Sequence, residues 1–90
     1  MSVRGEFRRL LKDLLVELRS TGLTRDVERE LEPLLERALE DLSGAAEAAL
    51  ALLPRVEPRA GSDSEQRRRF EDAFDRLDAV CRVILGRRSD

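Results

Sequence analysis

Apolar residues recur at intervals of three and four in three separate stretches of this chain, and this spacing limits what it can fold into. Such intervals place side chains on one face of an α-helix, which has about 3.6 residues per turn. The stretches predict helices over about residues 3–20, 25–53 and 64–86, with a loop over 54–63 that holds two prolines and a glycine. Ninety residues suffice for one core, so we expect a single all-α domain over 1–90, a three-helix bundle.

Short local signals mark the ends of these helices. Gly22 can adopt the left-handed conformation that closes a last turn, and Thr24 can accept a hydrogen bond from a free amide of the second helix. Ser62 followed by Glu65 forms a capping box ahead of the third stretch, whose apolar stripe ends at Gly86. These signals support the division into three helices.

The second stretch contains a proline that conflicts with its periodicity. Its apolar residues keep one helical phase from Val27 to Leu53, which favours one long helix across Pro33 and Gly44. A proline inside a helix costs about 3 kcal/mol, because it removes a backbone donor and clashes with the preceding turn. We therefore predict three helices, or four if Pro33 breaks the second.

The apolar stripe of the second stretch is unusually wide. It covers about 160° of a helical wheel, more than one neighbouring helix requires. We therefore expect a protein partner or a second copy of the chain to cover part of it, and a homodimer is one arrangement that would do so. The predicted partner interface consists of Leu35, Leu39, Leu42, Ala46 and Leu50.

Charged residues make up 40% of the chain, yet the formal net charge is only −2. Such balance is typical of a folded surface with salt bridges rather than of a disordered chain. Glutamates recur every four residues in the second stretch, and basic residues gather on one face of the first. We expect these groups to pair within the chain or to form a charged rim around the partner interface. The rim residues are Glu32, Glu36, Glu40, Arg8, Lys12 and Arg19.

The chain has no histidine, the commonest general base and metal ligand. Its glutamates occupy predicted solvent-facing positions and lack the Glu-x-x-His pairs of di-iron bundles. The single cysteine, Cys81, falls within the third apolar stripe, where a thiol packs as a small hydrophobe. We therefore expect no catalytic, metal-binding or cofactor-binding residue, no small-molecule substrate and no enzymatic activity.

Arginines of the third stretch and the C-terminus indicate an alternative function. A run of basic residues can neutralise nucleic-acid phosphates. However, consecutive residues point in different directions around a helix, and the chain lacks the aromatic side chains on which single-stranded bases stack. The alternative is a nucleic-acid-associated regulator. The residues it would use are Arg67, Arg68, Arg69, Arg87 and Arg88.

The remaining sequence features concern location and source. No stretch approaches the roughly eighteen apolar residues that span a bilayer, and a lone cysteine suits a reducing compartment. We therefore expect a cytoplasmic protein without membrane contact. One lysine among 17 basic residues is typical of a GC-rich genome and indicates a bacterial source. The sequence thus predicts a small non-catalytic helical interaction module, such as an adaptor, assembly or regulatory subunit.

Overall fold

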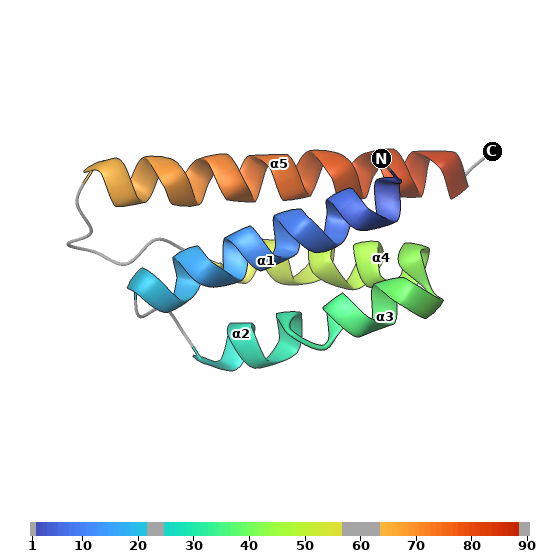
Figure 1. Cartoon of the computed structure of the whole chain (residues 1–90), viewed down its shortest axis with the longest axis horizontal. Helices are drawn as coiled ribbons and strands as arrows, with labels where there is room; N and C mark the ends of the chain where they lie inside the picture. Colours follow the sequence, from blue (N-terminus) through green and yellow to red (C-terminus); the bar gives the residue numbers. More distant parts are fainter. Residues whose placement is uncertain (1, 22–24, 57–63, 89–90) are drawn as a thin grey trace.

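All the regular structure in the described part of the chain is helical (Figure 1). The computed structural model describes residues 2–21, 25–56 and 64–88. Its elements are the helices α1 (Val3–Thr21), α2 (Arg25–Leu31), α3 (Leu34–Glu40), α4 (Leu42–Leu52) and α5 (Ser64–Arg88), with a short 3-10 turn, η1 (Leu53–Arg55). The predicted all-α class is confirmed.

The prediction of one helix over 25–53 is wrong, because that stretch is divided twice. The first division lies at Glu32 and Pro33, the site at which we expected a possible break. There the backbone amide of Leu35 donates to the carbonyl of Glu32, three residues earlier, at 3.1 Å. After this turn α3 follows α2 along the same side of the molecule (Figure 1).

The second division, at Asp41, was not predicted. Asp41 has an extended backbone, with φ −141° and ψ 83°, and the chain reverses there so that α4 runs back beside α3 (Figure 1). The side chain of Asp41 accepts a hydrogen bond from the backbone N–H of Gly44 at 2.9 Å and so caps α4. The apolar residues keep the same helical spacing on both sides of this reversal, which is why the sequence pattern alone suggested an unbroken helix.

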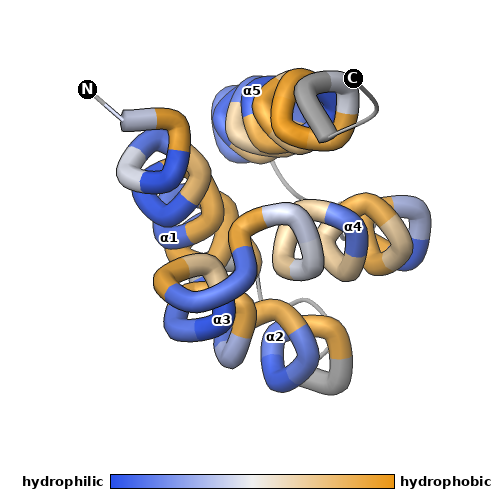
Figure 2. The backbone as a smooth tube through the Cα atoms, turned by 90° about the vertical axis from the view of Figure 1, so that its right-hand side faces the viewer, coloured by the Kyte–Doolittle hydropathy of each residue, from blue (hydrophilic) through white to orange (hydrophobic). Residues whose placement is uncertain are grey.

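The helices form four rods around a shared core, and the fourth rod arises from the reversal at Asp41 and not from the break at Pro33 that we considered (Figure 1). α1, the α2–α3 pair, α4 and α5 surround the centre, with their apolar faces turned towards it (Figure 2). α1 packs along α5 more extensively than any other helix pair packs. The molecule is elongated, measuring 42 × 22 × 21 Å.

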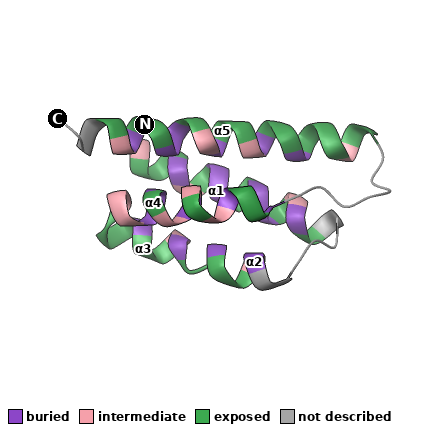
Figure 3. Cartoon of the chain, turned by 180° about the vertical axis from the view of Figure 1, so that it is seen from behind, coloured by how far each residue is buried: buried purple, intermediate pink, exposed green. Residues whose placement is uncertain are grey.

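Every helix contributes buried side chains to this core (Figure 3). Ala38 of α3 and Ala45 and Ala49 of α4 are fully buried, and such small side chains allow neighbouring helix backbones to approach closely. Larger residues from the other helices fill the centre. The largest fully buried side chains are Phe7, Leu11, Leu14, Leu18, Leu31, Leu53, Leu77 and Cys81.

The predicted helix ends agree with the structure only in part. α5 continues through Gly86 to Arg88, two residues beyond the end predicted from its apolar stripe. Part of the predicted loop over 54–63 is the turn η1, followed by a buried Val56. The predicted signals at Gly22, Thr24 and Ser62 lie outside the described residues.

Candidate interaction groove

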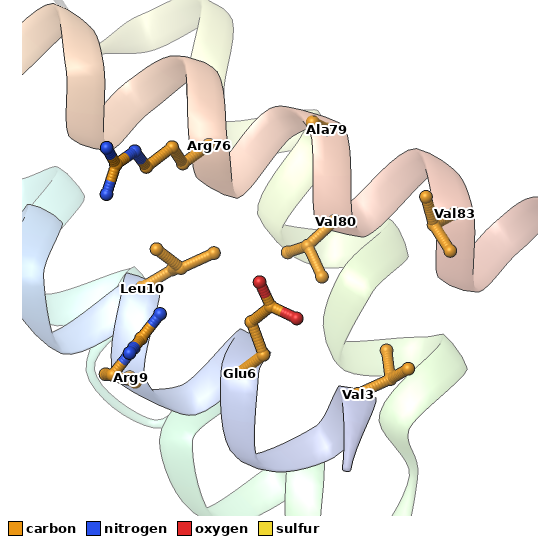
Figure 4. A pocket seen from close by; sticks show the side chains of 8 residues that line it. All are labelled: Val3, Glu6, Arg9, Leu10, Arg76, Ala79, Val80 and Val83. Carbon is orange, nitrogen blue, oxygen red and sulfur yellow. The ribbon is translucent and has the colours of Figure 1, made fainter. Parts of the chain in front are cut away.

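A groove runs between α1 and α5, which lie side by side in opposite directions (Figure 1). One part of it is a hollow of about 510 Å³ near the start of α1 and the end of α5 (Figure 4). The side chains that line this hollow are Val3, Glu6, Arg9, Leu10, Arg76, Ala79, Val80 and Val83.

A second hollow of about 230 Å³ continues the first along the same two helices. The two share Leu10 and Arg76, so they form one continuous surface, here called the α1–α5 groove. The residues that line the second hollow are Leu10, Asp13, Val16, Glu17, Arg69, Asp72, Ala73 and Arg76.

The groove has an apolar floor and an exposed apolar residue towards each end. Leu10 and Val80 are buried and form part of the floor. Val16 is 58% exposed and Val83 is 49% exposed, although both are apolar. Val16 lies outside the core-facing stripe of α1, and Val83 lies one turn after the buried Val80, beside it in the first hollow. The groove thus combines a partly apolar floor with one exposed valine in each hollow.

The two edges of the groove differ in charge. The α1 edge carries three acidic residues and one basic residue, namely Glu6, Asp13, Glu17 and Arg9. The α5 edge carries two basic residues and one acidic residue, namely Arg69, Arg76 and Asp72. On that edge Arg76 Nε lies 3.3 Å from Asp72 Oδ2. Figure 4 shows the Glu6 carboxylate pointing into the groove from one side, with Arg76 on the other.

No known family matches this chain. Family models, curated proteins and solved structures were compared with it, and none matches. Within residues 2–21, 25–56 and 64–88, no three acidic or thiol side chains are placed so that they could hold a metal ion. Among the helices of that same part, none has the length and apolar character needed to cross a membrane.

Part of the predicted charged rim pairs within the chain. Arg19, near the end of α1, forms ion pairs with Glu28 and Glu32, the latter at 3.8 Å. The hydrogen bond to Glu28, and then the charge of that carboxylate, raise the pKa of Arg19 above its ordinary value. These groups are largely open to water, so the pairs orient α2 against α1 but add little stability.

Other arginines of α1 bind backbone carbonyls of α3 instead of glutamates. Arg8 Nε donates to the carbonyl of Leu35 at 3.0 Å, and Arg4 Nε donates to the carbonyl of Ala38 at 2.9 Å. The carbonyl of Ala38 belongs to the last turn of α3, where carbonyls lack a partner in their own helix. These contacts were not predicted, because nothing in the local sequence shows which carbonyl faces an arginine.

The remaining rim residues lie on the surface. Lys12 on α1 is exposed, as are Glu36 and Glu40 on α3. The structure therefore gathers Arg19 and Glu32 into one ion-paired cluster, but it does not assemble all six rim residues around a single surface.

The five residues of the predicted partner interface do not share one exposed face. Ala46 is fully buried in the core, and Leu39 is 52% exposed. Leu35, Leu42 and Leu50 are half-buried and pack against the core. The physical reason is the reversal at Asp41, which turns the stripe of α3 towards that of α4.

The arginines of the alternative function are also separated. Arg67, Arg68 and Arg69 are exposed in the first turns of α5. Arg87 and Arg88 belong to its last turn, and their side chains lie outside the described part. At about 1.5 Å of rise per residue, these two groups stand roughly 27 Å apart along the helix. They do not form one basic patch.

Cys81 is buried at the centre of α5, as the sequence pattern predicted. Burial, and then the charge of Asp78, raise the pKa of its thiol to about 12. A thiol with so high a pKa stays protonated near neutral pH and is a poor nucleophile. Its position is that of a packing residue.

Proposed function

We propose that this chain is a small non-catalytic protein-interaction module that pairs with a second copy of itself through the α1–α5 groove. The observation that carries the proposal is the exposure of Val16 and Val83 over the apolar floor of that groove. Covering apolar surface stabilises a complex by about 25 cal/mol for each Å² removed from water. Covering both valines therefore contributes favourably to a pairing.

The charges on the two edges support a second copy as the occupant. In a dimer whose twofold axis runs along the groove, α1 of each copy lies over α5 of the other. The mainly acidic α1 edge then meets the mainly basic α5 edge twice. Asp13 and Glu17 line the same hollow as Arg69 and Arg76, so these groups lie at matching heights across the interface. Complementary charges of this kind select partner and register more than they add affinity.

This proposal moves the docking surface away from the stripe of the second predicted helix. The reversal at Asp41 covers most of that stripe with the chain itself. Leu39 stays exposed but does not line the groove. It provides a matched control, because it is an apolar surface residue with an exposed fraction like those of Val16 and Val83.

Sedimentation equilibrium over a range from micromolar to millimolar concentration tests the pairing. We expect the unchanged chain to dimerise, and Val16→Glu or Val83→Glu to weaken the dimer by about tenfold or more, because each buries an unpaired charge in the interface. Leu39→Glu should leave the dimer intact. A strictly monomeric chain, or a Leu39→Glu variant as disruptive as the groove variants, would contradict the proposal.

A mixing experiment tests the orientation. Asp13→Arg places like charges opposite Arg69 of the second copy, and Arg69→Asp places like charges opposite Asp13. Each variant should therefore dimerise poorly alone. A mixture of the two should form heterodimers, because both interfaces then join opposite charges. Equal pairing in all combinations would exclude this orientation.

The exposure of Arg67, Arg68 and Arg69 favours one alternative, a nucleic-acid-associated regulator. Its support is weaker, since Glu65, Glu71 and Asp72 stand among these arginines and offset their charge. A gel shift at low salt with duplex and single-stranded DNA and RNA tests it. Retardation that disappears in the Arg67→Gln/Arg68→Gln/Arg69→Gln variant would support the alternative, and no retardation of the unchanged chain would exclude it.

A further inference from the structure

A single residue, Asp41, separates α3 from α4, although the apolar stripe keeps one helical phase through it. We call Asp41 the hinge. Ala38 lies before it, and Ala45 and Ala49 lie after it; Ala45 follows Ala38 by seven residues and Ala49 follows Ala45 by four. All three are fully buried. This spacing suits a straight helix over 34–52 as well as it suits the observed reversal.

The contacts that hold the hinge closed are local. The cap on Gly44 is specific to the bend, whereas two backbone hydrogen bonds beside it would also exist in a continuous helix. They run from the N–H of Asp41 to the carbonyl of Arg37 at 2.7 Å and from the N–H of Ala45 to the carbonyl of Asp41 at 3.0 Å, and each joins residues four apart. The guanidinium of Arg37 lies 3.8 Å from the Asp41 carboxylate. All of these groups lie within residues 37–45, so they act on the hinge alone, whereas the bend itself brings α3 and α4 of one chain together.

The long-range contacts, in contrast, join the part of the chain before Asp41 to the part after it. α1 packs on α5, and α3 packs on α4. The ion pair between Glu30 and Arg55, at 2.7 Å, also spans the hinge. If residues 34–52 straighten, each of these contacts can form again between two chains, because the two halves remain complementary.

We propose that the chain opens at Asp41 into one continuous helix over 34–52 and exchanges its halves, 1–40 and 42–88, with a second copy. Such an exchange keeps the buried apolar surface and gives up only the local contacts of the hinge. It is a different pairing from the groove dimer, and the α1–α5 groove persists in it, built from one helix of each chain. The exchange therefore does not depend on the proposed function.

Two substitutions should favour the open form. Asp41→Ala removes the cap of the closed hinge. Gly44→Ala introduces a Cβ that would overlap the Asp41 carboxylate in the closed form, so it disfavours that form while Asp41 is present. Losing a cap weakens the closed form by about fivefold for each chain, so the association constant should rise by about twenty-five-fold because a dimer contains two hinges. Gly86→Ala is the matched control, since a Cβ there meets no atom within 4 Å.

A crosslink across the hinge distinguishes exchange from docking. Glu30→Cys/Arg55→Cys places two surface thiols whose parent side chains are in contact, while the buried Cys81 does not compete for a short bismaleimide. In the closed chain, and in a groove dimer, the reagent joins the thiols within one chain. In an exchanged dimer it joins two chains, which then migrate as a covalent dimer on a denaturing gel. All samples carry Val83→Glu, so that groove pairing does not contribute.

We expect the covalent dimer to be scarce in the parent protein, to increase by about twenty-five-fold or more with Asp41→Ala/Gly44→Ala, and to be unchanged with Gly86→Ala. Refolding the parent from urea at millimolar concentration should also produce the covalent dimer. A Gly-Ser-Gly insertion after residue 41 should abolish the covalent dimer, since the straight helix is then interrupted.

If only intrachain crosslinks form both in the double variant and after concentrated refolding, the proposal is overturned. The parent refolding arm decides the matter if the double variant does not fold. A monomeric chain without Val83→Glu would reject the groove dimer alone.

Discussion

The side-chain carboxylate of Asp41 accepts a hydrogen bond from the backbone N–H of Gly44 at 2.9 Å, and the absent side chain of Gly44 makes room for it. A Cβ at residue 44 would overlap both that carboxylate and the guanidinium of Arg37. This pair therefore marks the point at which α4 begins and the chain reverses. Its energetic coupling can be measured directly.

A double-mutant cycle should show that coupling. Asp41→Ala should lower the free energy of unfolding by about 1 kcal/mol, the usual cost of a lost helix cap. Gly44→Ala should bring no net gain in the unchanged chain, but it should stabilise the Asp41→Ala variant by about 1 kcal/mol, because alanine then acts only as a better helix former. Urea unfolding at low protein concentration measures both effects. Gly86→Ala should stabilise both backgrounds equally, and strictly additive effects of residues 41 and 44 would contradict the coupling.

The hydrogen bonds from α1 to α3 should contribute measurably to stability. Arg8→Met keeps the apolar stem but removes the donor to the carbonyl of Leu35, so we expect a loss of about 1 kcal/mol. Arg4→Met should cost less, since Arg4 is more exposed. Lys12→Met, on the exposed face of the same helix, is the control and should change the free energy of unfolding by less than about 0.5 kcal/mol. Equal losses at residues 8 and 12 would show that these carbonyl contacts do not matter.

Burial of Cys81 should make the folded chain sensitive to alkaline pH. Its pKa rises from an ordinary 9.0 to about 12 in the folded protein, so above about pH 9 the unfolded chain loses a proton that the folded chain keeps. Stability should therefore be complete below about pH 9 and decline above it, by up to about 1.4 kcal/mol per pH unit. Urea unfolding of the unchanged chain and of the Cys81→Ala variant across this pH range isolates the contribution of Cys81, because the two proteins share all their other titratable groups. Parallel pH profiles for the two proteins would disprove it.

Two residues of the predicted partner interface should respond oppositely to substitution. Ala46→Leu should destabilise the chain by about 1–3 kcal/mol, because Ala46 is fully buried and a larger side chain would overpack the core there. Leu39→Lys should stay within about 0.5 kcal/mol of the unchanged chain, since Leu39 is a surface residue. Thermal unfolding followed by circular dichroism distinguishes the two outcomes. A tolerant Ala46 together with a sensitive Leu39 would contradict the reversal at Asp41.

Part of the candidate groove could be anticipated from the sequence, and its assembly could not. Val16 stands outside the core stripe of its own helix, so its exposure is visible in the spacing of residues alone. Val83 gives no such signal, because it lies beside Val80 and Ile84 within an apolar run. The groove exists only once α1 and α5 are placed side by side, which is decided by contacts between residues far apart in the chain.

The sequence by itself determined the helical class, the position of the division at Pro33 and the two long helices, to within about two residues at their ends. These features follow from spacing and backbone chemistry within a few neighbouring residues. The tertiary structure alone decided the reversal at Asp41, and with it the burial of Ala46 and the carbonyl partners of Arg4 and Arg8. A straight and a folded α3–α4 segment have the same apolar phase, so only the packing of the whole chain distinguishes them.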